Sequence, residues 1–132
     1  MVVFLMEKNL LSEVINVTLY RRGYKLERDI MDKLEQEGYY VIRSAGSHRL
    51  CDVIAIPKSN DPDPRVLCIQ CKKTSIPNRM PKITKKELEE YIKLEREYHV
   101  KVYFALRWRE KGRWKTEIIS LMDYIKNYVG GE

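Results

Sequence analysis

The sequence has little of several residue types, and each shortage excludes a class of protein. No stretch reaches the roughly 18–20 consecutive apolar residues of a membrane span, and the apolar opening Val2–Met6 ends at two charged residues without a basic leader. We therefore expect a soluble, cytoplasmic protein with no membrane partner. The 3 cysteines are few and odd in number, so we expect reduced thiols and no disulfide framework.

The chain also lacks internal repeats, low-complexity stretches and any linker long enough to divide it. Its 132 residues are the usual length of one domain, and 44% hydrophobic residues are enough to bury a core. We therefore expect a single domain over residues 1–132. Within residues 1–20, the apolar side chains of 4–19 are too dense to show a clear period, and they predict a helix or an arm.

Acidic residues are fewer than basic ones: the chain has 19 Asp and Glu and 25 Lys and Arg, which gives a net charge of +6. Most of the excess lies in two segments. Residues 71–86 contain six basic residues and no acidic one, and residues 101–115 contain six basic residues and only Glu110. Solvated surfaces usually mix both signs, so this distribution favours a polyanionic partner such as the phosphate backbone of nucleic acid.

Hydrophobic periodicity predicts an alternation of helices and strands. Helices are expected over 24–37, 84–99 and 121–128, and strands over 39–42, 52–56, 66–73, 100–108 and 114–119. Thr84 and Glu87 have the spacing of a capping box. Trp108 and Trp114 flank a hairpin-like connection over 109–113, and they are predicted to pack on each other across the strands. This order predicts an α/β fold, a mixed central sheet flanked by helices.

Polar residues with the chemistry of a metal site surround the second and third predicted strands. Asp52 opens one strand, and Gln70 and Lys72 end the next, where period-two alternation places both on one face and Cys71 on the other. Glu27 and Ser47 lie on the preceding helix and turn. Each residue alone is more often a surface residue. Together they form the oxygen-rich cluster that hard divalent cations prefer.

Four sequence blocks carry a more specific signal, and they span about residues 21–75. They are Gly23–Arg28, Gly38–Ser47, Cys51–Ala55 and Ile69–Lys73. In these blocks the chain resembles the archaeal-type Holliday-junction resolvases, a branch of the PD-(D/E)xK nuclease superfamily. The resemblance implies a restriction-endonuclease-like nuclease fold and a nucleoid-associated enzyme that resolves four-way DNA junctions by paired symmetric cuts.

The resemblance also implies roles for the site residues. Asp52 would be the principal metal-binding carboxylate, Glu27 the helix carboxylate, Ser47 the serine near the scissile phosphate, and Lys72 the motif lysine that orients water or stabilises charge. The cofactor would be Mg²⁺, which Mn²⁺ can replace, with no small-molecule cofactor. The implied metal ligands are Glu27, Asp52, Gln70 and the backbone carbonyl of Cys71.

The same resemblance implies that the partner is branched DNA bound by a two-fold homodimer, which sets two active sites against symmetry-related strands. The basic residues of the matching blocks and of the acid-free segment are then the expected contacts to the DNA backbone. These predicted contacts are Arg21, Arg22, Arg43, Arg49, Lys73, Arg79, Lys82, Lys85 and Lys86.

One position departs from the family pattern, because Gln70 stands where the family has glutamate. An amide oxygen can ligate a metal, but the site loses one negative charge and one proton acceptor. Three interpretations remain open at this stage: a natural variant that still cleaves, a natural junction-binding relative with little catalysis, or a Glu→Gln change made to keep DNA uncleaved. We expect a resolvase with weakened activity.

Other classes compete with this interpretation. His48, Cys51, Cys68 and Cys71 have spacings found in zinc sites, but alternation sends Cys68 and Cys71 to opposite faces of a strand, which disfavours shared coordination. A catalytically silent protein that binds branched DNA, and a restriction- or repair-type nuclease on the same core, share the electrostatics. Cleavage assays on different DNA structures discriminate among them.

Overall fold

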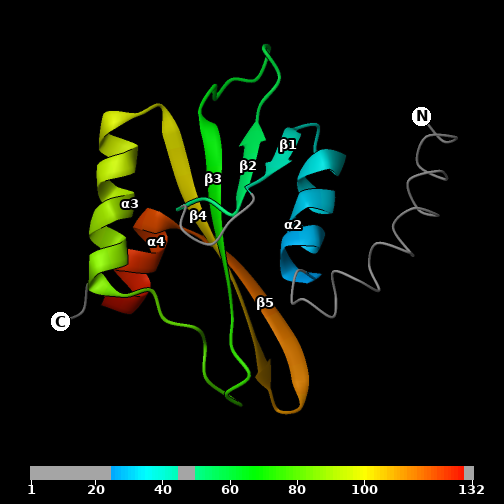
Figure 1. Cartoon of the computed structure of the whole chain (residues 1–132), viewed down its shortest axis with the longest axis vertical. Coiled ribbons are helices and arrows are strands. Elements are labelled where there is room, and N and C mark those ends of the chain that lie inside the picture. The colour runs from blue at the N-terminus through cyan, green and yellow to red at the C-terminus, as the bar shows by residue number, and fades with distance from the viewer. Residues whose placement is uncertain (1–24, 45–49, 130–132) are drawn as a thin grey trace, which may run out of the picture.

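The computed structural model describes residues 25–44 and 50–129, in which one sheet lies between two layers of helix (Figure 1). Helix α2 (Lys25–Gln36) packs on one face, and helices α3 (Lys85–Glu97) and α4 (Leu121–Tyr124) pack on the other. The strands are β1 (Tyr40–Arg43), β2 (Val53–Ile56), β3 (Val66–Lys73), β4 (Val100–Glu110) and β5 (Arg113–Ser120). The predicted α/β class is confirmed.

The five strands lie side by side in chain order. β3 and β4 pair in parallel and are connected through α3, whereas the other neighbours pair antiparallel. Pairing between β2 and β3 stops at Val53 opposite Ile69, while β3 continues beside β4 to Lys73. The sheet therefore opens into a fork where β2 begins and β3 runs on. We call this place the β2–β3 fork.

The two predicted long helices are present, and local chemistry explains their ends. Leu26, Ile30 and Leu34 recur at helical spacing and are the buried residues of α2. Gly38 follows with φ +97°, a left-handed conformation that favours glycine and ends the helix. The capping box predicted for α3 is present, with Thr84 as N-cap and Glu87 bonded back to it.

The alternation predicted for β3 sorts its side chains into two cores. Cys68 belongs to the core under α3 and α4, together with Phe104, and Ile69 belongs to the core under α2. The C-terminal helix predicted over 121–128 is present, but only α4 is α-helical, and the chain continues as a wider π-type turn, η1 (Ile125–Val129). No helix in the described part of the chain is long and apolar enough to cross a membrane. Residues 4–19, predicted as a helix or arm, lie outside the described residues.

The prediction of three reduced thiols was wrong. Cys51 and Cys68 form a disulfide, with their Cα atoms 5.1 Å apart, and Cys71 is free. The antiparallel pairing of β2 with β3 brings the residue before β2 within bridging distance of Cys68, a proximity that spacing along the chain does not reveal. The disulfide also removes two of the four residues from the competing zinc interpretation.

The predicted packing of Trp108 on Trp114 was also wrong. The hairpin between β4 and β5 has a two-residue turn, Lys111–Gly112, so Trp108 pairs with Lys115 and Trp114 pairs with Arg109. Because neighbouring residues of a strand point to opposite faces, the two tryptophans lie on opposite sides of the hairpin. Trp108 is 4% exposed and belongs to the core, whereas Trp114 is 44% exposed.

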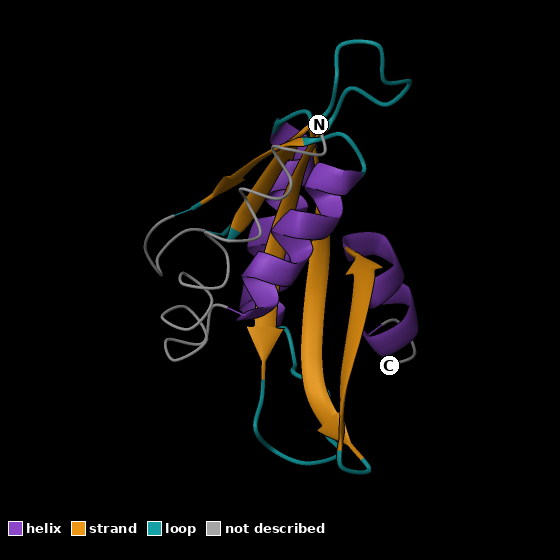
Figure 2. Ribbon diagram, turned by 90° about the vertical axis from the view of Figure 1, so that its right-hand side faces the viewer, coloured by secondary structure: helices purple, strands orange, loops and turns teal. Residues whose placement is uncertain are grey.

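The β4–β5 hairpin is longer than predicted and extends beyond the helices at the lower end of both ribbon views (Figures 1 and 2). The segment that follows β3 is bonded along the same end. The N–H groups of Thr74 and Asn78 donate to the carbonyl oxygens of Arg107 and Arg109, at 3.1 and 2.7 Å. This end of the molecule is therefore a hydrogen-bonded arm.

Candidate active site

Asp52 lies in the β2–β3 fork and is held by main-chain bonds on both sides. Its N–H donates to the carbonyl oxygen of Ile69 (2.9 Å), and its own carbonyl oxygen accepts from Ser44 N (2.8 Å). Its carboxylate oxygen Oδ2 accepts from the N–H of Cys71 at 2.8 Å. The side chain of Asp52 is thus fixed beside the polar residues at the C-terminal end of β3.

Glu27, on the first turn of α2, lies close enough to the fork for the charge of Asp52 to act on it. Its side chain is 17% exposed, and its Oε2 lies 3.6 Å from Nε of Arg43. Burial raises the pKa of Glu27, and the negative charge of Asp52 raises it further, against the opposing effect of Arg43. Burial likewise raises the pKa of Asp52, opposed by the Cys71 N–H and by the charges of Arg43 and Lys72.

The raised pKa values of Glu27 and Asp52 have their cause in partial desolvation, and for Glu27 also in repulsion by Asp52. A divalent cation between such groups would favour their ionised forms. The donor set available to it is two carboxylates and neutral oxygens. Among the described residues no three His, Cys, Asp or Glu side chains gather as a cluster. The residues therefore fit a hard cation, with less negative charge than three acidic ligands would supply.

Gln70 lies in the same fork, with its side-chain amide inside a ring of acceptors. With its nitrogen facing them, the amide donates to the carbonyl oxygen of Leu50 (2.6 Å), to Tyr91 Oη (3.1 Å) and to Asp52 Oδ2 (3.2 Å). Tyr91 is 1% exposed, and its hydroxyl donates in turn to the same Leu50 carbonyl. Three acceptors therefore surround the Gln70 nitrogen, which offers Asp52 a donor where a glutamate would offer a second negative charge.

Lys72 follows on the same face of β3 but is engaged by a residue that sequence reasoning did not assign to the site. Its Nζ lies 2.7 Å from Oε2 of Glu87 and donates to Oε1 at 2.9 Å. Burial tends to raise the pKa of Glu87, but Lys72 and the donors of Thr84 outweigh it and hold the pKa below its usual value. One carboxylate therefore caps α3 and binds the motif lysine.

A signal for Glu87 exists in the sequence. It is the first acidic residue after the acid-free segment 71–86, and its capping-box position fixes where its side chain points. The spacing could not show that Lys72 lies within reach, because that contact joins residues 15 positions apart in sequence. No comparable signal marks Tyr91 as a partner of Gln70.

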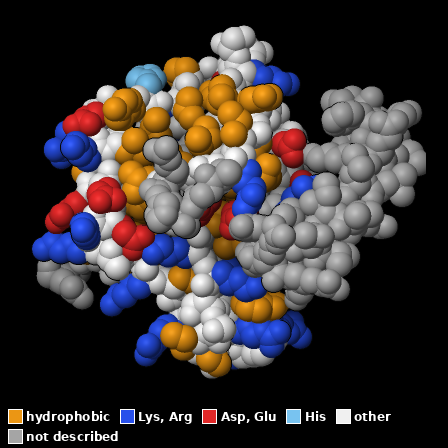
Figure 3. Space-filling view, in the orientation of Figure 1, with side chains coloured by type: hydrophobic (Ala, Val, Ile, Leu, Met, Phe, Trp, Pro, Cys, Tyr) orange, Lys and Arg blue, Asp and Glu red, His pale blue; other side chains and the backbone are white. Residues whose placement is uncertain are grey.

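The remaining predicted residues fall into three groups. Arg43 lies beside Glu27, inside the fork. Lys73, at the end of β3, is exposed, and so are the basic side chains of the following loop and of the start of α3: Arg79, Lys82, Lys85 and Lys86. The residues Arg21, Arg22, Ser47 and Arg49 lie outside the described residues. In Figure 3 the lower end of the molecule shows Lys and Arg side chains and no acidic ones on the visible face.

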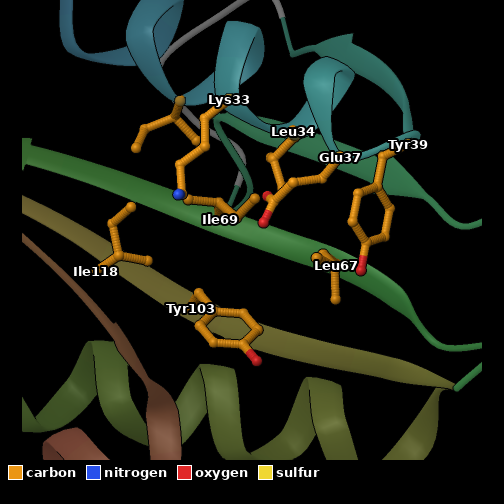
Figure 4. A pocket seen from close by; sticks show the side chains of 9 residues that line it. Lys33, Leu34, Glu37, Tyr39, Leu67, Ile69, Tyr103 and Ile118 are labelled. Atoms are coloured by element: carbon orange, nitrogen blue, oxygen red, sulfur yellow. The ribbon is translucent and has the colours of Figure 1, made fainter.

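The apolar pocket of about 230 Å³ beside α2 is a separate feature (Figure 4). Leu34, Leu67, Ile69, Tyr103 and Ile118 line it, between the helix and strands β3 to β5. None of the predicted site residues lines it. Its charged lining residues are Lys33 and Glu37, and none of the polar residues of the β2–β3 fork lines it, so the two features are separate.

Comparison with known proteins is consistent with this geometry. The family model "Archaeal holliday junction resolvase (hjc)" matches residues 18–129. The chain is 36% identical over 110 residues to the "Crossover junction endodeoxyribonuclease Hjc" of Methanocaldococcus jannaschii, which covers 83% of this chain and 76% of the relative. Among solved structures, it is similar in fold to a Holliday junction resolvase, Hjc, from Archaeoglobus fulgidus. That match has a TM-score of 0.55 and 20% identity, over 76% of this chain and 74% of the other.

Proposed function

Because the chain belongs to the archaeal Holliday junction resolvase family, we propose that it is a structure-specific endodeoxyribonuclease acting on four-way DNA junctions. The observation that carries the proposal is the meeting of Glu27, Asp52, Gln70 and Lys72 at the β2–β3 fork. These residues come from a helix and from two strands. They supply oxygen ligands and a cation side by side, as phosphodiester hydrolysis requires.

The cofactor in this proposal is Mg²⁺, with Mn²⁺ as a substitute. Asp52 and Glu27 would hold the cation, together with the amide oxygen of Gln70 and the carbonyl oxygen of Cys71. When bound, it supplies positive charge that stabilises the negative charge developing on the phosphodiester. The chain's own part is to keep both carboxylates close and partly desolvated, with Asp52 fixed by the N–H of Cys71.

Lys72 has the role of orienting water or stabilising negative charge at the scissile phosphate. Glu87 is its positioning residue, because two short contacts hold the ammonium group at one place beside the fork. Without Glu87, the flexible lysine stem would have to be ordered by the substrate. Ser47 remains a predicted residue near the scissile phosphate.

DNA binding in this proposal rests on the exposed basic residues at the end of β3, in the loop that follows it and at the start of α3. Lys73, Arg79, Lys82, Lys85 and Lys86 are candidate contacts to phosphates, and Arg21, Arg22 and Arg49 remain predicted contacts. A two-fold homodimer would present two such surfaces and two sites to one junction. Arg43 contacts Glu27, so its first role is to balance charge within the fork.

A second candidate function is a junction-binding protein with little catalysis, and the hydrogen bonding of Gln70 favours it. The Gln70 nitrogen donates to Oδ2 of Asp52, which also accepts from the N–H of Cys71, so two donors compete with a cation for that oxygen. The amide must therefore turn its oxygen to the fork before it can ligate. We expect this chain to bind junctions and to cleave them slowly.

The test is cleavage and binding on a panel of labelled DNAs of equal length: duplex, nicked, flap and four-way. A resolvase binds the four-way DNA most tightly and, with Mg²⁺, makes paired symmetric cuts that EDTA abolishes. The variant Asp52→Asn is the control for contaminating nucleases. Junction binding without cuts at saturating Mg²⁺ supports the second candidate, and equal affinity for duplex and junction contradicts both. Sedimentation analysis tests the homodimer.

A further inference from the structure

Trp114 is an exposed aromatic side chain at the end of the hydrogen-bonded arm, and the proposed catalytic site does not use it. It is 44% exposed, while Trp108 on the other side of the hairpin is 4% exposed. Tryptophan buries more apolar area than almost any other residue, so an exposed ring at this position has a cost in the free protein. A ligand that covered the ring would remove this cost.

Two cations lie over the Trp114 ring. Lys73 Nζ is 4.5 Å from the ring centroid, and Arg109 Cζ is 4.9 Å from a ring of the same side chain. Lys73 belongs to the acid-free segment 71–86, and Arg109 is the cross-strand partner of Trp114. Aromatic rings bordered by cations are the usual elements of sites for single-stranded nucleic acid, where the ring stacks on a base and the cations bind phosphates.

The arm holds these three side chains in place before any ligand binds. The turn Lys111–Gly112 has φ values of 52° and 79°, which closes the hairpin tightly and fixes the register of Trp114 against Arg109. The N–H of Lys111 donates to Oδ1 of Asn78 at 2.8 Å, which ties the turn to the loop after β3. A preorganised site loses less entropy when it binds.

The position relative to the fork identifies the kind of base. Lys73 directly follows Lys72 but points to the opposite face of β3, the face on which α2 packs and from which Glu27 reaches the proposed site. Paired bases inside a continuous duplex are covered by their neighbours, whereas a branch or an unpaired nucleotide leaves a base face uncovered. We propose that Trp114 stacks on an unstacked base at the branch of the DNA, with Lys73 and Arg109 on the flanking phosphates. This inference rests on the proposed function.

The chain offers a direct optical test, because it contains 2 tryptophans. Trp114→Ala leaves buried Trp108 as an internal reference. We expect a four-way junction, and a duplex with one unpaired base, to quench the emission of the unmodified protein. Neither should quench Trp114→Ala, and a fully paired duplex should quench neither protein. Equal quenching of the variant and the unmodified protein would overturn the stacking role.

Affinity measurements at one fixed salt concentration complete the test. Trp114→Ala should raise the junction Kd by roughly 5- to 150-fold, the value of one base–aromatic stack, and the duplex Kd by less than about twofold. Trp114→Phe should restore most of the affinity. Tyr98→Ala is the matched control, because Tyr98 is also an exposed aromatic residue, 63% exposed, at the far end of α3.

The outcomes separate this inference from the function on which it rests. Junction preference that survives Trp114→Ala with an unchanged Kd overturns the stacking role and leaves the resolvase. If Trp114→Ala loses quenching and also changes its sedimentation mass, Trp114 lies between two copies of the chain. That result also overturns the stacking role. Absence of junction preference in the unmodified protein contradicts the resolvase, while quenching by the bulged duplex would still support stacking.

Discussion

Replacing Gln70 by glutamate probes the electrostatics of the β2–β3 fork most directly. The amide nitrogen now donates to Leu50, to Tyr91 and to Asp52. A carboxylate at this place can only accept hydrogen bonds, so two of these contacts become repulsive and only the Tyr91 hydroxyl can turn to donate. The substitution Gln70→Glu therefore removes satisfied hydrogen bonds and adds a like charge beside Asp52.

The size of this effect follows from the distance to Asp52. Two unit charges 3.2 Å apart repel by about 5 kcal/mol at an effective dielectric constant of about 20. The fork is partly open to solvent, which leaves roughly 1–3 kcal/mol of destabilisation. This repulsion raises the pKa of the new carboxylate in the folded protein. Its cost is therefore present above the ordinary glutamate pKa of about 4.3 and disappears as the pH falls below it.

Thermal unfolding in EDTA measures the cost. At pH 8 we expect Gln70→Glu to lower the Tm by about 3–10 °C, with a smaller difference at pH 5. Saturating Mg²⁺ should reverse the loss, because a cation between the carboxylates replaces repulsion with attraction. In single-turnover cleavage of a labelled junction, the variant should be faster by orders of magnitude, and Asp52→Asn added to it should abolish cleavage.

Gln36→Glu is the matched control, since Gln36 is the other glutamine of the chain and lies exposed at the end of α2. It adds the same charge away from the fork and should change the Mg²⁺ dependence of neither Tm nor cleavage. An unchanged Tm for Gln70→Glu in EDTA at pH 8 would refute the placement of the Gln70 amide beside Asp52. Equal cleavage rates at low Mg²⁺ would show that the amide is a competent ligand.

Three further predictions follow from the site and its surroundings. Glu87→Gln keeps the capping box but frees Lys72, so single-turnover cleavage should fall at least tenfold with unchanged junction Kd, whereas Thr84→Ala should lower the Tm and spare cleavage. Lys85→Ala with Lys86→Ala should weaken junction and duplex binding alike and make the salt dependence shallower; unchanged binding would make this run an ordinary solvated surface. Because the pKa values of Glu27 and Asp52 are raised, Mg²⁺ affinity measured by calorimetry should begin to fall at a higher pH than unperturbed carboxylates would give; a flat profile down to pH 4 would contradict this.

Much of the fold could be predicted because its signals are local. The burial of Leu26, Ile30 and Leu34, the glycine that ends α2 and the capping box of α3 are all patterns within a few residues. The alternation of β3 correctly separated the faces of Cys68 and Ile69 and placed Gln70 with Lys72. Periodicity of this kind depends only on backbone geometry.

The wrong predictions concern contacts that depend on register and on distance across the sheet. A five-residue connection would have set Trp108 opposite Trp114, but the two-residue turn shifts the pairing by one residue and so places the two rings on opposite faces. The Cys51–Cys68 bond, the Lys72–Glu87 pair and the bonding of Gln70 to Tyr91 join residues 15 to 21 positions apart. Sequence spacing alone gives no distance between such residues.

The disulfide between Cys51 and Cys68 has a consequence for how the protein unfolds locally. It closes a loop over a sequence separation of 17 residues that contains β2 and begins next to Asp52. Such a crosslink limits the conformations of the unfolded chain and is worth about 3 kcal/mol in the chain-entropy model. When α2 or α3 opens transiently, β2 remains tethered to β3. Amide hydrogens of β2 and β3 should therefore exchange only through the largest unfolding events of the chain. Reduction of the disulfide should let them exchange through smaller and more frequent unfolding events.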